Sequence, residues 1–222
     1  MEKTGYRPWA IGKYFLPFVL PIAYCLLPIA SCLFFIGCAS TKGHVTLMPM
    51  PAASPEYDIS GQKITFSNQD VKISILPIKP SEVKKMLAGK DANNPLAEIL
   101  AAPQYLAFRL DMENSSKAKI MYNPALTTLF DNTMGVHKPL DYTDLYTLIG
   151  DSPSPEAVIN TIKDIIYDLA VTLAPGQHTS RLLIFSGIEE GISEVAITMK
   201  EIYIGTSTIA VSFGFRIQKE NE

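Results

Sequence analysis

Apolar and polar residues alternate along much of the chain, and the alternation is clearest near the C-terminus. Between residues 208 and 218, Ile209, Val211, Phe213, Phe215 and Ile217 are separated by small or polar residues. A period of two places successive side chains on opposite faces of an extended chain, which predicts a half-buried strand. Strands of this kind are expected at residues 62–67, 71–78, 104–113, 119–122, 127–131, 179–185, 194–199 and 208–218, with 201–205 as a candidate for a separate strand.

The alternation changes phase between Met199 and Ile202, and a bulge or turn near Lys200 and Glu201 explains the change. Strands with one apolar and one solvated face form antiparallel sheets that pack face to face. The chain also lacks the regular alternation of strands and helices that a parallel sheet needs. The predicted fold class is therefore mainly β: an immunoglobulin-like antiparallel β-sandwich with helical insertions.

Helical periodicity interrupts the strand pattern in two regions. Two short helices are expected near residues 81–89 and 95–102, each starting at a capping residue or a proline. A longer helix begins at Pro155, and its apolar stripe has a period of 3.6 residues, formed by Val158, Ile159, Ile162, Ile165, Ile166 and Leu169. With one or two helical turns at 141–149, it makes an insertion from about 137 to 171.

This insertion has two interpretations that the sequence leaves open. In the first, it caps one open end of the sandwich and buries its isoleucines there. In the second, it binds a partner, because loops and insertions on a rigid scaffold commonly carry recognition. Tyr142 and Tyr146 are the residues we expect at the rim of such an interface.

The first 37 residues have the order of a secretory signal. A short basic segment, residues 1–13, precedes a run from Tyr14 to Ile36 that contains no Asp, Glu, Lys or Arg. This run of 23 residues is long enough to span a bilayer, so a retained membrane anchor is the alternative. Three prolines interrupt the run and small residues follow it, which favours a signal peptide that is removed.

The end of this run, Phe35-Ile36-Gly37-Cys38, resembles the lipobox of bacterial lipoproteins. The resemblance implies cleavage after Gly37 and attachment of lipid to Cys38. Residues 38–58, rich in Pro, Ser and Ala, are then expected to form a flexible tether to a domain at 59–222. Ala39 follows the cysteine where Asp would mark retention at the inner membrane. The expected location is the cell envelope, on the outer membrane and facing the periplasm.

A second resemblance covers part of the exported domain. The segment LAPGQHTSRLLIF, residues 173–185, is similar to a turn and strand of immunoglobulin-like domains in secreted bacterial lipoproteins of unknown role. The segment YLAFRLDMENSSKAKI, residues 105–120, is similar to the strand that accompanies it in those domains. This resemblance supports the fold and adds nothing about activity, because such folds host many unrelated roles.

Charge and candidate chemistry exclude several functions. The net charge of −3 becomes −5 when residues 1–37 are removed, because three cations and one acid are lost, so no basic surface for nucleic acid is expected. His44, His137 and His178 are far apart in sequence and show no metal-binding spacing. No nucleophile elbow or phosphate-binding glycine loop is present. We therefore predict no catalytic residue, cofactor or metal.

Three aspartates are the remaining candidates for cation binding. Asp131, Asp141 and Asp144 could together ligate calcium, but local structure explains each of them more simply. Asp131 is followed by Asn132 and Gly135, which is typical of a turn, and Asp141 precedes a helical segment as a cap would.

Two hypotheses about function follow. The favoured one is a non-catalytic, lipid-anchored envelope protein that binds or assembles with another envelope protein. The alternative is a solute-binding lipoprotein or a hydrolytic enzyme with a cleft between the insertion and the sandwich, using Asp141, Asp144 or His137. A polar pocket with shifted carboxylates would favour the alternative, and an apolar surface would favour partner binding.

Overall fold

The computed structural model describes residues 45–52, 54–88, 94–150, 152–167, 169–186 and 191–219. Contacts divide the chain into two units, Met1–Lys42 and Gly43–Glu222, and every described residue belongs to the second. The predicted signal, the lipobox and Cys38 therefore lie outside the described residues. Within the described ranges, no helix is both long and apolar enough to cross a membrane.

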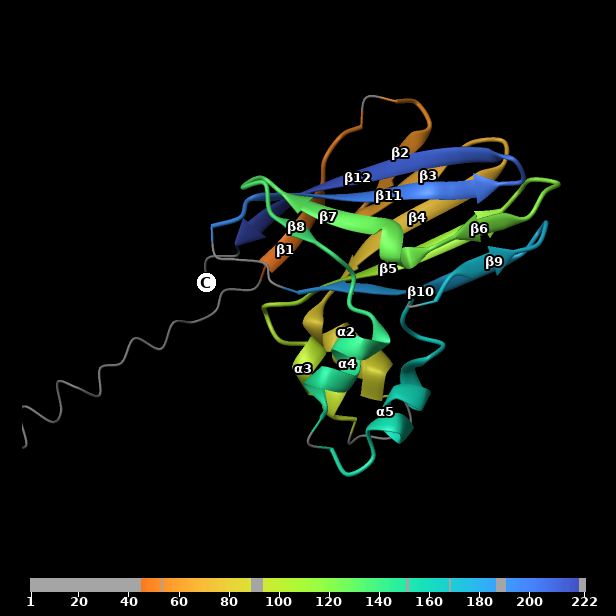
Figure 1. Cartoon of the computed structure of the whole chain (residues 1–222). Coiled ribbons are helices and arrows are strands. Elements are labelled where there is room, and N and C mark those ends of the chain that lie inside the picture. The colour runs from red at the N-terminus through yellow and green to blue at the C-terminus, as the bar shows by residue number, and fades with distance from the viewer. Residues whose placement is uncertain are drawn as a thin grey trace, which may run out of the picture. The chain divides into compact units, whose positions relative to one another are not determined.

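The described unit is built on two antiparallel sheets (Figure 1). Sheet A has the order β1-β12-β11-β6-β9, with β7 pairing β11 and β8 pairing β7. Its strands are β1 (Val45–Pro49), β6 (Ile120–Tyr122), β7 (Thr127–Asp131), β8 (Val136–His137), β9 (Val171–Leu173), β11 (Glu194–Ile204) and β12 (Ser207–Lys219). Sheet B has the order β10-β5-β4-β3-β2. Its strands are β2 (Tyr57–Ser60), β3 (Lys63–Ser67), β4 (Val71–Ile78), β5 (Leu106–Asn114) and β10 (His178–Phe185).

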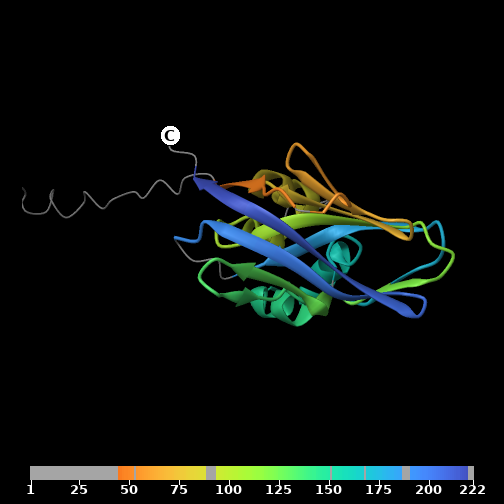
Figure 2. The same cartoon turned by 90° about the horizontal axis from the view of Figure 1, so that it is seen from above.

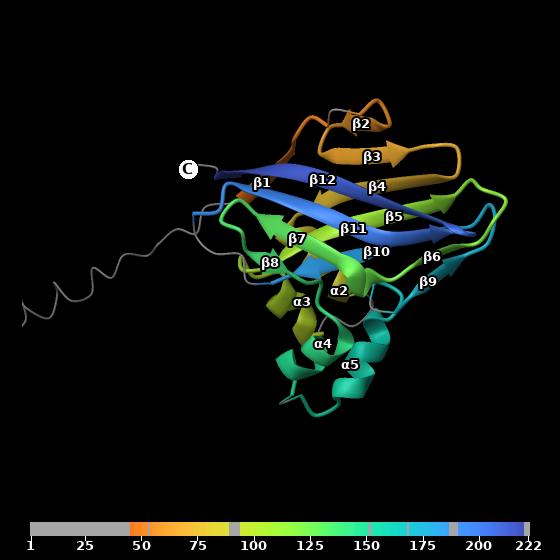
Figure 3. The same ribbon diagram turned by 45° about the horizontal axis from the view of Figure 1, so that its top comes forward.

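The strand pairing agrees with the predicted immunoglobulin-like sandwich. In immunoglobulin-type domains the A, B and E strands share one sheet, while the C, F and G strands share the other. In sheet B, β5 lies between β4 and β10, and these three correspond to strands B, A and E. In sheet A, β11 lies between β12 and either β6 or β7, and these correspond to strands F, G and C. Figure 3 shows sheet A in front of sheet B. The fold is mainly β, with two packed antiparallel sheets, as predicted.

The two faces of sheet B pack against different layers. On β10, Leu183 and Phe185 belong to the core between the sheets, whereas Leu182 and Ile184 belong to a second apolar cluster. Because alternate side chains of a strand point to opposite faces, the second cluster lies on the outer face of sheet B. A layer of helices covers that face and completes the second cluster.

Four helices form this layer, two from each interruption of the strand pattern. They are α2 (Pro80–Ala88), α3 (Pro95–Leu100), α4 (Tyr142–Leu148) and α5 (Pro155–Ile162), and a 3₁₀ helix, η1, spans Pro124–Leu126. Ile159, Ile162 and Ile166 of the predicted stripe are buried in the second cluster. The insertion thus buries its isoleucines, but against the outer face of sheet B and not over an open end of the sandwich.

The long helix ends earlier than predicted. α5 stops at Ile162, and residues 163–165 form a turn that leads to the edge of β10. There Leu182 donates its N–H to the carbonyl of Ile165 at 2.7 Å, and Tyr167 donates to the carbonyl of Leu182 at 2.9 Å. The unpaired backbone groups of an edge strand are strong hydrogen-bonding sites. Pairing with β10 therefore replaces the last turns of the expected helix, and Leu169 is 70% exposed.

The predicted tether at 38–58 is wrong at residues 45–49 and 57–58, which belong to strands. Val45–Pro49 forms β1, which pairs with β12 from Val45 opposite Lys219 to Pro49 opposite Phe215, and Leu47 is buried in the core. Tyr57–Ser60 forms β2 at the edge of sheet B. β11 pairs with one edge of β12 from Ser207 to Arg216, and β1 pairs with the other edge from Phe215 to Lys219. An edge strand offers unpaired backbone groups, and β1 satisfies them here.

The other predicted strands are present within two residues of their expected bounds, except that β11 runs on beyond residue 199 to Ile204. The short strands β8 and β9 were not predicted. The predicted bulge is also confirmed, because the register of β11 on β12 shifts between Met199 and Ile202. Glu201 at this shift has a φ of 55°, a left-handed conformation that suits a bulge. β11 therefore continues through residues 201–204 as a single strand.

Candidate functional site

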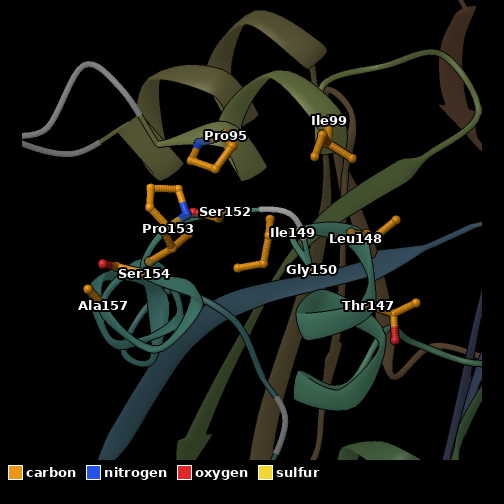
Figure 4. A pocket seen from close by; sticks show the side chains of 11 residues that line it. Pro95, Ile99, Thr147, Leu148, Ile149, Gly150, Ser152, Pro153, Ser154 and Ala157 are labelled. Carbon is orange, nitrogen blue, oxygen red and sulfur yellow. The ribbon is translucent and has the colours of Figure 1, made fainter.

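The helical layer contains an open groove of about 690 Å³ between α3, α5, the end of α4 and the loop that joins α4 to α5. Figure 4 shows side chains from these segments around it. Its lining residues are Pro95, Ile99, Thr147, Leu148, Ile149, Gly150, Ser152, Pro153, Ser154, Ala157 and Val158.

Asn94 sets the positions of the helices on one side of the groove. Its side-chain oxygen accepts a hydrogen bond from the N–H of Leu96 at 3.0 Å and so caps α3, with Pro95 at the first turn. Its side-chain nitrogen donates to the carbonyl of Leu87 at 3.0 Å and to the Thr161 hydroxyl at 3.3 Å. Because Asn94 is buried, this one amide ties the end of α2 and the start of α3 to α5.

A capping box at the start of α4 sets the position of the helix on the other side of the groove. The Asp141 carboxylate accepts from the N–H of Asp144 at 2.9 Å, and the Asp144 carboxylate accepts from the N–H of Asp141 at 3.0 Å. This reciprocal pair fixes the start of α4, which confirms the predicted cap. Two of the three residues that the alternative hypothesis could use, Asp141 and Asp144, are thus engaged with backbone N–H groups.

The groove is mainly apolar. Thr147, Ser152 and Ser154 supply hydroxyl groups, and the Thr147 hydroxyl donates to the carbonyl of Thr143 at 3.0 Å within its own helix. None of the described lining residues is Asp, Glu, His, Lys or Arg. Such a lining suits apolar side chains and offers no acid, base or nucleophile activated by a neighbour.

The two predicted rim tyrosines lie on α4 but do not line the groove. Tyr142 is partly buried against the second cluster, and its hydroxyl donates to the carbonyl of Lys163 at 3.2 Å. Tyr146 is 39% exposed and directly precedes Thr147, a lining residue. The groove is lined by the predicted insertion and also by α3, which the sequence analysis did not assign to a site. Ile99 could have indicated that α3 has an accessible apolar face, because it extends the apolar face of this helix beyond the buried Leu96 and Leu100.

Asp131 and His137 form a second polar cluster, in the β7–β8 hairpin. The carboxylate of Asp131 accepts from the His137 ring at 2.9 Å, from the Thr133 hydroxyl at 2.6 Å and from the N–H groups of Thr133 and Gly135 at 2.8 Å each. The hydrogen bonds from His137 and then Thr133 hold the pKa of Asp131 well below its usual value. A Cβ at Gly135 would collide with this carboxylate. The predicted turn is confirmed.

The structure brings Asp131 and His137 together and leaves the other candidate polar residues apart. Asp131 and His137 belong to the hairpin of sheet A, Asp141 and Asp144 cap a helix, and His178 is exposed on β10 opposite Glu113. His44 and Cys38 lie outside the described residues. Within the described part of the chain, no three His, Cys, Asp or Glu side chains are grouped so as to hold a metal ion.

Comparisons with known proteins found no family and two distant structural matches. No protein-family model matches the chain, and no curated protein matches it. Among solved structures, the chain is similar to the yjhA protein of Bacillus subtilis at 12% identity, over 67% of this chain and 93% of that one, with a TM-score of 0.36. It is also similar to a functionally unknown protein of Listeria monocytogenes EGD-e at 20% identity, over 79% of this chain and 89% of that one, with a TM-score of 0.33.

Proposed function

We propose that this protein is a lipid-anchored, non-catalytic component of the bacterial cell envelope that binds an apolar segment of another envelope protein in the groove of its helical layer. The observation that carries the proposal is the lining of that groove, which is apolar, open and without a charged side chain among its described residues. Catalytic sites need convergent polar groups with shifted pKa values, and partner surfaces need accessible apolar area.

The anchoring part of the proposal rests on the sequence. The run that ends in Phe35-Ile36-Gly37-Cys38 supports processing before Cys38 and attachment of lipid to its sulfur. Ala39 supports delivery to the outer membrane, with the domain in the periplasm. A membrane anchor raises the effective concentration of the domain toward other proteins of the same membrane, so a modest groove suffices for binding.

The construction of the groove supports binding of a protein segment. The helical parts of its walls are held by the buried Asn94 amide and by the Asp141–Asp144 capping box, so these parts are preformed. Its exposed lining includes Thr147, Pro153 and Ala157. Apolar side chains of an incoming helix or extended segment would lose contact with water there, in the manner of helix-in-groove recognition.

A site-specific photocrosslink in the native host tests the proposal. The crosslinking amino acid replaces Ala157, which lines the groove, and in the control it replaces Asn160, which is exposed on the same helix but does not line the groove. We expect an envelope protein to be captured from position 157 and not from position 160. Binding of the purified partner should then be lost in Ala157→Arg and kept in Asn160→Arg.

Two results would overturn the proposal. Equal capture from both positions would show that the groove does not select a partner. Recovery of the protein with an unmodified Cys38 and its first 37 residues still attached would remove the anchoring. Equal melting temperatures of the two arginine variants serve as the control for folding, since both sites are exposed.

A further inference from the structure

The β7–β8 hairpin ends in a turn whose apolar side chains point into solvent. Met134 in this turn is 91% exposed, and Val136 at the start of β8 is 62% exposed. Met134 also has a φ of 70°, a left-handed conformation that Gly and Asn adopt more readily than Met. A large apolar residue that is exposed and in an unfavourable backbone conformation contributes nothing to the folded core. Its side chain is therefore available for contact with something outside the domain.

The hairpin holds these residues rigidly. Asp131 accepts two backbone N–H groups of the turn as well as the His137 ring, as described above. The Asn132 side chain accepts from the N–H of Ser193 at 3.0 Å and from the N–H of Glu194 at 3.3 Å, which fastens the turn to the start of β11. The apolar tip is thus presented by a fixed support.

The tip lies at the end of the sandwich where the described chain begins. Asp131, Val195, Phe215 and Pro49 face one another across β7, β11, β12 and β1. Beyond this row β7 continues into the β7–β8 turn. When β1 is followed from Pro49 back to Val45, it leaves the row in the same direction and so reaches the same end of the sandwich. Three strand spacings separate β7 from β1, or about 14 Å. Figures 1 and 2 both show the β7–β8 turn and the start of β1 at one end of the unit.

The length of chain before β1 identifies what faces this end. Seven residues lead from Cys38 to Val45, and a fully extended chain covers at most about 3.6 Å per residue, which gives a reach of about 25 Å. When Cys38 carries its lipid, as proposed above, β1 must start within that distance of the bilayer surface. The hairpin tip is close enough to β1 to touch the same surface.

We propose that Met134 and Val136 contact the interfacial region of the membrane that holds the lipid anchor, and that this second contact fixes the orientation of the domain. The inference rests on the proposed anchoring at Cys38. The charges near the tip are compatible with a lipid surface: Lys138 is exposed next to β8, the Asp131 carboxylate is bonded to His137 and Thr133 within the turn, and Glu194 is paired with Arg216 at 3.1 Å. Apolar side chains flanked by a cation are typical of interfacial membrane contacts.

Tryptophan fluorescence tests this contact in the lipidated protein. The only tryptophan of the chain is Trp9, within the residues that processing removes, so a new tryptophan becomes a unique probe. Met134→Trp places the probe at the tip, and Thr206→Trp places a matched probe in the exposed β11–β12 turn at the other end of the sandwich. Each processed protein is reconstituted into vesicles of phosphatidylethanolamine and phosphatidylglycerol that contain a brominated lipid.

We expect emission from the probe at position 134 to shift to shorter wavelength and to be quenched by the brominated lipid, whereas the probe at position 206 stays as in water. Flotation with the vesicles and the mass of Cys38 report on anchoring separately. Flotation with an unquenched probe at position 134 would overturn the membrane contact and leave the anchoring intact. Failure to float would overturn both. A shift that appears only after a protein partner is added would assign the tip to that partner and overturn the inference.

Discussion

Asn114, the last residue of β5, provides the sharpest test of how the two sheets are joined. Its side chain is completely buried, and its nitrogen donates to the carbonyls of Ala118 at 2.8 Å and Leu173 at 2.9 Å. Its oxygen accepts from the N–H of Ser116 at 2.9 Å and from the Ser116 hydroxyl at 2.8 Å. Leu173 lies on β9 in sheet A, so this amide connects the end of sheet B to the other sheet.

Replacement by Leu keeps a similar volume and removes these hydrogen bonds. Each bond contributes roughly 1 kcal/mol, and a buried group left without a partner adds to the loss, so Asn114→Leu should destabilise the domain by at least about 3 kcal/mol. This is a large part of the roughly 5–15 kcal/mol that is typical of a domain. Asn68→Leu is the control, since Asn68 accepts two N–H groups in an accessible turn and should cost about 1 kcal/mol.

Asn114→Asp separates hydrogen bonding from shape. The new carboxylate would face the carbonyls of Ala118 and Leu173, and burial beside these oxygens would raise its pKa in the folded state. The variant should therefore be most stable below about pH 4, the unfolded value, and should lose stability as pH rises through its folded pKa. Guanidinium unfolding followed by circular dichroism measures both effects. An Asn114→Leu variant no less stable than Asn68→Leu, or an Asn114→Asp variant unaffected by pH, would refute the reasoning.

Three further predictions concern other parts of the domain. Gly135→Ala should lower the melting temperature, because the added methyl group would displace the Asp131 carboxylate from its turn; an unchanged melting temperature would contradict this. Tyr122→Phe should lower the free energy of unfolding, measured with denaturant, by about 1 to 2 kcal/mol, because it leaves the buried Thr127 hydroxyl without its partner at 2.6 Å. Adding Thr127→Val to this variant should recover part of the lost stability. Because the hydrogen bonds from His137 and Thr133 lower the pKa of Asp131, the wild type should lose stability relative to Asp131→Asn as pH falls below about 4, and NMR titration of the carboxyl carbon should show a midpoint below the usual value.

The sequence predicted most of the strands because their pattern reflects local geometry. A half-buried strand repeats every two residues whatever its neighbours are, so Ile209 to Ile217 identify β12 without any knowledge of β11. Caps and turns are equally local, which is why Asp141 and the turn after Asp131 were predicted correctly. β1 was missed because its few alternating residues precede two prolines and resemble a spacer.

The groove was less predictable than the strands. The apolar residues of α3 and α5 have the same pattern whether they are buried or line an open surface, and sequence periodicity cannot separate the two. Ile99 and Val158 became lining residues because the Asn94 amide spaces α3 and α5, with a contact to Thr161 across 67 positions. Tyr142 was predicted at an interface rim, but its hydroxyl is engaged inside the layer.

The sequence by itself determined the class of the fold, most strand positions, the caps and the expectation of a lipid anchor, since these depend on short stretches of chain and on the period of their apolar residues. Only the tertiary structure decided which strand edges were left without a partner strand. Val45–Pro49 pairs with the exposed edge of β12, and residues 165–167 form hydrogen bonds with the edge of β10 in place of the last helical turns. An unpaired strand edge offers backbone hydrogen bonds to any segment that reaches it, and that availability exists only after the sheets have formed.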